Sequence, residues 1–275
     1  MIKRMRFWII VGWLLSQAVF ALEVRGLYEV EVVAQSQAVG DRDKAIQAGL
    51  RIVLGRILVE PDLWLDDNAQ LLLAKAKDYV REYQFALTGV AGASEAPARV
   101  LRILFDEQKL QAVLRSSKLG LWNEIRPETL LWMVVEEQGK RLFFNPEKMS
   151  QLNIALRHAS KLQGVPILLP LMDIEEQSML SVAEVLSPYP HPLLDISERY
   201  EAVSILVGLI VSRNGCWQTE WAHYFDQRIQ QWQGVCKPLN QALLEGLRGT
   251  YLNLAAFYGV KPELPNKLPV PLKLH

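Results

Sequence analysis

The sequence feature that most limits the possible folds is the run ILVGLIV at residues 205–211, which contains no polar side chain. A strand with one solvated face alternates apolar and polar residues, whereas this run is apolar at every position except one glycine. Such a strand belongs in the middle of a sheet that is covered on both faces. We therefore expect an α/β fold in which the second half of the chain packs around residues 205–211.

An antiparallel hairpin is predicted directly after this strand, with its turn near Asp226 and Gln227. Cys216 and Cys236 lie ten residues on either side of Asp226, which would bring their Cα atoms within the range of a disulfide. An oxidising compartment favours that bond, and two reduced buried thiols are the alternative. No histidine lies at ligand spacing from either sulfur, so we expect no metal site here.

The amino-terminal segment, residues 1–21, has the pattern of a cleaved signal peptide. Three basic residues precede an apolar run at residues 7–20, and the predicted cut follows Ala21. The run is shorter than the roughly twenty residues that span a bilayer. We expect a periplasmic protein with no membrane span after cleavage; an inner-membrane anchor formed by residues 7–20 is the alternative.

Charge and composition exclude several classes of partner. The chain has 30 basic and 30 acidic residues, and cleavage of the signal peptide would remove three basic ones. The mature chain is then slightly acidic, which argues against nucleic acid and anionic lipid, because both need concentrated positive charge. Half of the residues are apolar, which is ample material for one or two cores.

Helix and strand patterns divide the mature chain into two small mixed-sheet subdomains with helices packed on them. Residues 22–122 have the predicted order strand, helix, helix, strand, strand, helix. Residues 123–260 contain an apolar strand at 130–135, a helix and a short strand at 166–171, which predicts a parallel crossover. The proline-rich tail, residues 261–275, is expected to be disordered.

Four features of the second half resemble one family of exported bacterial proteins. They are RPETLLW at 126–132, GVPILLPLMD at 164–173, SERY at 197–200 and the tryptophans Trp217, Trp221 and Trp232. In this order they resemble the domain of unknown function 2066, over about residues 27–260. The resemblance implies a Gram-negative envelope protein and supplies no activity or catalytic residue. In architecture alone, the second half also looks like the small α/β modules of periplasmic scaffold proteins such as the Tol-system propeller protein.

Arg199 and Tyr200 are the first candidates for a binding role. Arg199 precedes the apolar strand, where a guanidinium needs hydrogen-bond acceptors or solvent. In one interpretation it pairs with Asp173 or Asp195 and ties a helix to the sheet; in the other, Arg199 and Tyr200 line a groove for an anionic group. Asp173 ends the short strand at 166–171, where α/β folds place ligands, and a helix cap or salt bridge is its alternative role.

Tryptophans concentrate on the predicted hairpin. Alternation along a strand places Trp217 and Trp221 on one face, and we expect Trp232 on the other. One face should pack on a predicted final helix, residues 239–258. An exposed Trp232 would instead be a contact point for a partner protein or peptidoglycan.

No catalytic signature is present in the sequence. None of the four histidines forms an i, i+4 pair or an HExxH segment, and there is no GxSxG, Walker or GxGxxG motif. We therefore expect no catalytic residue, no cofactor and no metal, and a non-enzymatic interaction or assembly module with an envelope protein as its partner. The alternative is an envelope hydrolase, or a binder of small anionic ligands, that uses a strand-end cleft near Arg199.

Overall fold

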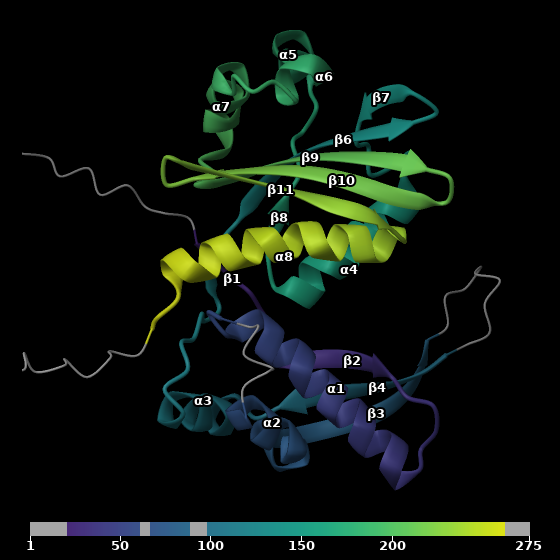
Figure 1. Ribbon diagram of the computed structural model, residues 1–275, viewed down its shortest axis with the longest axis vertical. Helices are drawn as coiled ribbons and strands as arrows, with labels where there is room; N and C mark the ends of the chain where they lie inside the picture. The colour runs from purple at the N-terminus through teal and green to yellow at the C-terminus, as the bar shows by residue number, and fades with distance from the viewer. Residues whose placement is uncertain (1–20, 61–66, 89–97, 262–275) are drawn as a thin grey trace, which may run out of the picture.

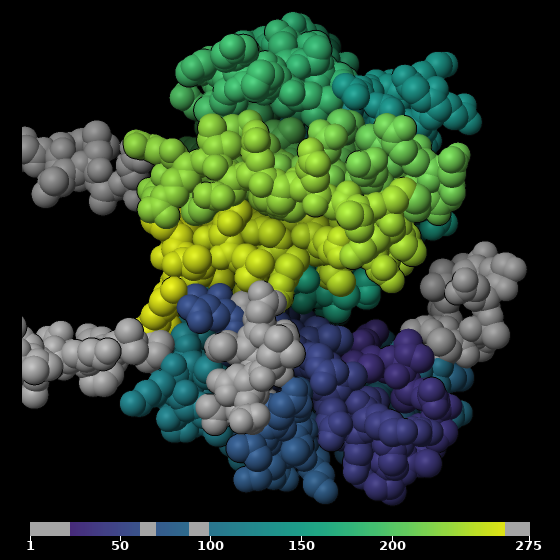
Figure 2. All heavy atoms as spheres, viewed as in Figure 1, coloured from purple at the N-terminus to yellow at the C-terminus, as the bar shows by residue number. Residues whose placement is uncertain are grey.

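The computed structural model describes residues 21–60, 67–88 and 98–261 of the 275-residue chain. These residues form two units, each a sheet with helices packed on it (Figure 1), and Figure 2 shows the same two units with all their heavy atoms. The predicted fold class is confirmed, because one sheet is three-stranded and antiparallel and the other is six-stranded and mixed. Residues 1–20 of the predicted signal peptide and all but Lys261 of the predicted tail lie outside the described residues.

The amino-terminal unit is a three-stranded sheet, in the order β2-β4-β3, with helix α1 lying across it. Leu50, Val53 and Leu54 of α1 are fully buried in the core between helix and sheet. Gly49 permits the close approach, since a Cβ at this position would lie 2.8 Å from Ile103. The elements of the unit are β2 (Glu29–Val33), α1 (Val39–Ile57), α2 (Asp67–Ala74), a 3-10 turn (Ala76–Tyr79), β3 (Val80–Thr88), β4 (Ala98–Phe105) and α3 (Glu107–Ser116).

The carboxy-terminal unit is built on a six-stranded sheet in the order β11-β10-β9-β6-β7, with β8 beside β6. The predicted central strand is confirmed as β9, which pairs parallel with β6 and antiparallel with β10 and is buried over its first eight residues. The strands are β6 (Thr129–Glu137), β7 (Lys140–Phe143), β8 (Ile167–Leu168), β9 (Ser204–Arg213), β10 (Cys216–Phe225) and β11 (Arg228–Lys237).

Helices cover the two faces of this sheet unequally (Figure 1). One face packs on α4 and α8, where Leu206 and Ile210 of β9 meet Leu247 of α8 in one core. The other face packs on the short helices α5 to α7, where Leu209 of β9 joins Leu193 of α7. The helices are α4 (Ser150–Gln163), α5 (Ile174–Met179), α6 (Val182–Val185), α7 (His191–Ser197) and α8 (Leu239–Tyr258). No helix in the described part of the chain is long and apolar enough to cross a membrane.

The predicted parallel crossover is present, because β8 follows α4 and pairs parallel with β6. The strand expected at residues 166–171 is nevertheless only two residues long, Ile167–Leu168. Pro166 and Pro170 flank it, and proline donates no ladder hydrogen bond, which explains the early end. Asp173 therefore lies five residues beyond the strand, and the prediction that it ends a sheet strand is wrong.

Two buried arginines join the units. Arg56 of α1 and Arg126 of β5 (Ile125–Pro127) are at most 1 % exposed, and β5 pairs with β1 (Ala21–Glu23). Neither guanidinium has a carboxylate partner among the described residues; both are surrounded by backbone carbonyls. Arg56 donates to Leu27 at 2.6 Å and, across to α4, to Lys161 at 3.2 Å. Burial lowers the pKa of each arginine to about 10, so both stay protonated at neutral pH.

Candidate functional site

The candidate site lies on the β10–β11 hairpin, which the structure describes in full. Its two turn residues, Asp226 and Gln227, have φ of +47° and +56°, as a type I′ turn requires. The predicted turn and disulfide are both present, and the Cα atoms of Cys216 and Cys236 lie 5.4 Å apart. The disulfide closes the end of the hairpin opposite the turn, and bonds of this kind are typical of oxidising compartments.

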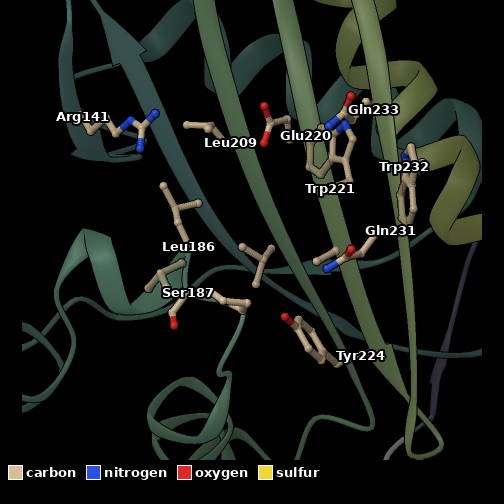
Figure 3. A pocket seen from close by; sticks show the side chains of 14 residues that line it. Arg141, Leu186, Ser187, Leu209, Glu220, Trp221, Tyr224, Gln231, Trp232 and Gln233 are labelled. Atoms are coloured by element: carbon tan, nitrogen blue, oxygen red, sulfur yellow. The ribbon is translucent and has the colours of Figure 1, made fainter.

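A groove of about 520 Å³ lies between the β10–β11 hairpin and the end of α6, where Val185 and the residues that follow it form one wall. Figure 3 shows Arg141 and Ser187 on one side of the groove and Tyr224 and Gln231 on the strands opposite. Arg141 is already paired with Glu136, at 2.6 Å. The described part of the chain holds no group of three or more metal-binding side chains, in the groove or elsewhere.

The turn determines which backbone groups of β11 face outward. A type I′ turn closes with the Arg228 N–H donating to the Phe225 carbonyl, so this pair is hydrogen-bonded, and antiparallel pairs then alternate. With the observed register, Ile229, Gln231 and Gln233 are in non-hydrogen-bonded pairs. Their backbone N–H and C=O groups therefore point away from β10. No described strand pairs with β11 on that side, so these groups form an open sheet edge.

Two of the three tryptophans of the β10–β11 hairpin, Trp221 and Trp232, lie against α8. Trp221 and Trp232 are directly opposite each other in the register, so they share a face, and the prediction that Trp232 points to the other face is wrong. A Cβ at Gly246 would lie 2.3 Å from the Trp221 ring, and one at Gly249 would lie 2.4 Å from the Trp232 ring. The two glycines of α8 thus form a notch for the indoles. Packing of one hairpin face on the final helix, as expected, includes Trp232.

Gly246→Ala will lower the free energy of unfolding by about 2 kcal/mol, because the added methyl group overpacks the contact with Trp221. This loss is expected even though alanine is more stable than glycine in the interior of a helix by about 1 kcal/mol. The Trp221 ring cannot retreat, because its other edge packs directly against the backbone of Gly208. The contact is so close that a Cβ added at Gly208 would lie only 2.4 Å from the ring. Urea denaturation measures the change. Gly40→Ala is the control, since nothing lies within 4 Å of its Cβ position, and equal effects of the two substitutions would contradict the notch.

Arg199 lies among carboxylates. Its guanidinium is 2.9 Å from Asp173, 3.4 Å from Glu175 and 3.6 Å from Glu176. The ion pair with Asp173 that one interpretation of the sequence expected is therefore present. Three carboxylates around one guanidinium leave an excess of negative charge, which disfavours an anionic ligand at this position.

Tyr200 and Asp173 complete the same tie between α5 and the segment before β9. The Tyr200 hydroxyl donates to the Glu176 carboxylate and accepts the Leu171 N–H at 2.8 Å. Burial, with this bond to Glu176, raises the pKa of Tyr200 to about 12. Asp173 caps α5 by accepting the Glu176 N–H at 2.9 Å, and this bond, with Arg199, lowers the pKa of Asp173. The arrangement is that of a structural tie between two chain segments.

His223 is a buried titratable residue that belongs to no recognisable sequence motif. The one indication in the sequence is its position two residues after Trp221, which places both side chains on the same face of β10. Ser204 Oγ lies 2.9 Å from His223 Nε2 and 2.8 Å from Thr129 Oγ1, and the Asn253 amide nitrogen lies 3.3 Å from Nδ1. An amide nitrogen can only donate, so Nδ1 accepts and Nε2 carries the proton. The imidazole therefore donates to Ser204 and does not activate it as a nucleophile.

Comparison with known protein families finds a match for the amino-terminal unit. Residues 21–123 match a domain of unknown function (DUF8605). This is a different family from the domain of unknown function 2066, and the resemblance to the latter stays a prediction. No curated protein matches the chain.

Two solved structures show a distant similarity. One is a competence-damaged protein (CinA) superfamily protein from Enterobacter cloacae, with 10 % identity and a TM-score of 0.24, covering 53 % of this chain and 85 % of that one. The other is a competence or damage-inducible protein from Enterobacter asburiae, with 13 % identity and a TM-score of 0.24, covering 54 % of this chain and 93 % of that one. At these values neither similarity carries a functional assignment.

Proposed function

We propose that this chain is an exported, non-enzymatic interaction module that binds an extended segment of an envelope protein along β11. The observation that carries the proposal is the open edge formed by the backbone of Ile229, Gln231 and Gln233. Another extended strand can form hydrogen bonds with such a row of alternating N–H and C=O groups. Peptides bind to the exposed edges of sheets in this way.

The sequence and anchoring of β11 support a docking role. Proteins usually protect a long edge strand with charges or proline, but residues 229–236 contain neither. The strand is also held in place before any partner arrives, by the Cys216–Cys236 disulfide and by Trp232 packed on α8. A strand that is already ordered loses little entropy on binding, which favours affinity.

The outward groups of β11 accept any extended strand that offers a matching row of N–H and C=O groups. The partner proposed here is a foreign strand, and the mass of the crosslinked adduct distinguishes it from a second copy of the chain.

Separate features support the two other parts of the proposal, namely export to the periplasm and a role without catalysis. The signal-peptide pattern of residues 1–21, the disulfide and the resemblance to the domain of unknown function 2066 all favour the periplasm. Arg141, Glu220 and Tyr224 are the titratable groups in the lining of the groove beside β11, and this lining contains no histidine, cysteine or lysine. This lining suits recognition of side chains next to an added strand better than acid–base catalysis.

Photo-crosslinking in intact envelopes tests the proposal, with the photoreactive residue at Ile229, which is 53 % exposed. We expect one abundant protein adduct. Gln231→Pro will abolish it, because proline removes an outward N–H without breaking a bond to β10. Gln231→Thr keeps that N–H, suits a strand and should keep the adduct.

Urea denaturation of both Gln231 variants will verify that each keeps its fold. An adduct of equal yield in Gln231→Pro, or no adduct from the folded wild-type chain, would overturn strand addition at this edge. An adduct with the mass of two copies would replace the foreign partner by self-association.

A further inference from the structure

The groove and the open edge of β11 share two residues. Gln231 and Gln233 line the groove, and their backbone N–H and C=O groups point away from β10. Gln231 lies directly opposite Ala222 in the register, and residues that are directly opposite share a face of the sheet. Because side chains alternate between the two faces of a strand, a strand added to β11 would turn every second side chain toward the groove.

The groove has an apolar floor and a polar rim. Val207 and Leu209 of β9 form the floor, where 5 % and 6 % of their surface stays exposed, and Ala222 packs against the same core. The charged side chains of the lining are Arg141 and Glu220, which have opposite signs, so the lining carries no net charge. A neutral and largely apolar side chain therefore fits this groove better than a charged one.

Ala222 leaves a hollow on the groove face of β10. It has the smallest side chain in the lining, and its neighbours on the same face of this strand are the much longer Glu220 and Tyr224. Figure 3 shows Tyr224 and Gln231 extending from the hairpin toward Leu186. Because neighbouring strands are about 4.8 Å apart, an added strand would lie about 10 Å from β10. A long aromatic side chain spans that gap across Gln231, whereas a short aliphatic side chain does not.

A β-bulge limits the length of the segment that can bind. The register pairs Trp217 with Lys237 but Thr219 with Gly234, so β11 has one extra residue in this interval. An extra residue of this kind interrupts the ladder and bends the strand, which ends regular pairing at a sheet edge. The edge therefore suits an added segment of about seven residues, opposite residues 228–234 of β11.

We propose that the segment that adds to β11 carries an aromatic side chain opposite Gln231 and an aliphatic residue two positions away, opposite Ile229. The aromatic ring lies over Gln231, fills the hollow at Ala222 and is removed from water there. The aliphatic residue packs on Ile229, which is 53 % exposed, as apolar cross-strand pairs do in sheets. This side-chain preference rests on the proposed addition of a strand to β11.

Fluorescence anisotropy with three labelled peptides and the full chain tests the preference. The peptides are TVTFTVT, TVTVTVT and TVFTTVT. In the first, phenylalanine shares a face with a valine on either side, so the pattern is available in both strand orientations. The second lacks the ring, and the third has the same composition but phenylalanine on the face opposite to the valines. We expect saturable binding of the first and binding at least about tenfold weaker for the other two, because each loses apolar contacts on the groove face.

Ala222→Leu then locates the ring, because the larger side chain fills the hollow and leaves the backbone of β11 unchanged. It should weaken binding of TVTFTVT about tenfold and should not weaken binding of TVTVTVT. Ala74→Leu is the matched control at an exposed position of α2 and should change neither affinity. Gln231→Pro should abolish binding of every peptide, because it removes an outward N–H from the edge.

Urea denaturation verifies the fold of each variant, and the outcomes separate this inference from strand addition itself. Equal affinities for the three peptides, or an unchanged affinity for TVTFTVT in folded Ala222→Leu, would overturn the aromatic preference; if Gln231→Pro still abolishes binding, strand addition stands. Binding that folded Gln231→Pro retains, or no saturable binding of any peptide up to roughly 1 mM, would overturn both. If Ala222→Leu does not fold, the comparison of the three peptides decides alone.

Discussion

Arg126→Met will lower the free energy of unfolding by about 3 to 5 kcal/mol. Arg126 is fully buried, and every hydrogen bond it donates goes to a backbone carbonyl. Methionine has a similar length but no donor, so these buried carbonyls lose a partner, at about 1 to 3 kcal/mol each before relaxation. The acceptors are Asn123 at 2.8 Å, Gly164 at 2.7 Å, Arg56 at 2.5 Å and Trp122 at 3.0 Å.

The effect should be large because these carbonyls belong to both units. The Arg56 carbonyl is at the end of α1, and the Gly164 carbonyl follows α4. Urea denaturation followed by tryptophan fluorescence measures the change. Arg157→Met is the matched control, since Arg157 is exposed on α4 and should change stability by no more than about 0.5 kcal/mol. If the two variants differ by less than about 1 kcal/mol, Arg126 does not hold the units together.

Stability will also fall as the pH decreases from about 6.5 to about 4, and His223 will account for about 3 kcal/mol of the loss. Burial lowers the pKa of His223 from 6.5 to about 4 in the folded protein. In the unfolded chain the imidazole regains its ordinary pKa, so between these pH values the unfolded state binds more protons. Protonation then favours unfolding, and the stability present above pH 6.5 is lost as the pH approaches 4.

The pH dependence of His223→Gln isolates this contribution. Denaturation midpoints at several pH values between 4 and 7 should fall less steeply for this variant than for the wild type. His158→Gln, at an exposed position of α4, should keep the wild-type slope. If His223→Gln keeps it too, the buried imidazole is not the source of the acid sensitivity.

The sequence predicts the centre of the fold well because local periodicity reports burial. The run at residues 205–211, which has no polar side chain, is typical of a strand covered on both faces, and β9 is such a strand. The positions of Cys216 and Cys236 around the turn likewise predict their bond, because a hairpin relates residues by simple spacing from its turn. For Arg199 the sequence supports two interpretations and does not choose between them, and the structure shows the ion pair with Asp173.

The face of Trp232 shows where this reasoning fails. Alternation orders the side chains within one strand, but the relation between two strands depends on the length of the turn. With two residues in the turn, Trp221 and Trp232 are direct partners and share a face; one residue more or less would separate them. The same dependence decides which groups of β11 face outward, so the open edge at Gln231 also follows from the register.

The sequence by itself determined the α/β class, the central strand, the hairpin and its disulfide, because each depends on residues that are close in the chain or on a regular period. Only the tertiary structure decided which distant side chains meet. Arg126 reaches the Arg56 carbonyl across 70 residues, His223 meets Ser204 and Asn253 from other elements, and Leu186 lines the same groove as Gln231. These meetings depend on how whole helices and sheets pack on each other, which no local pattern of residues encodes.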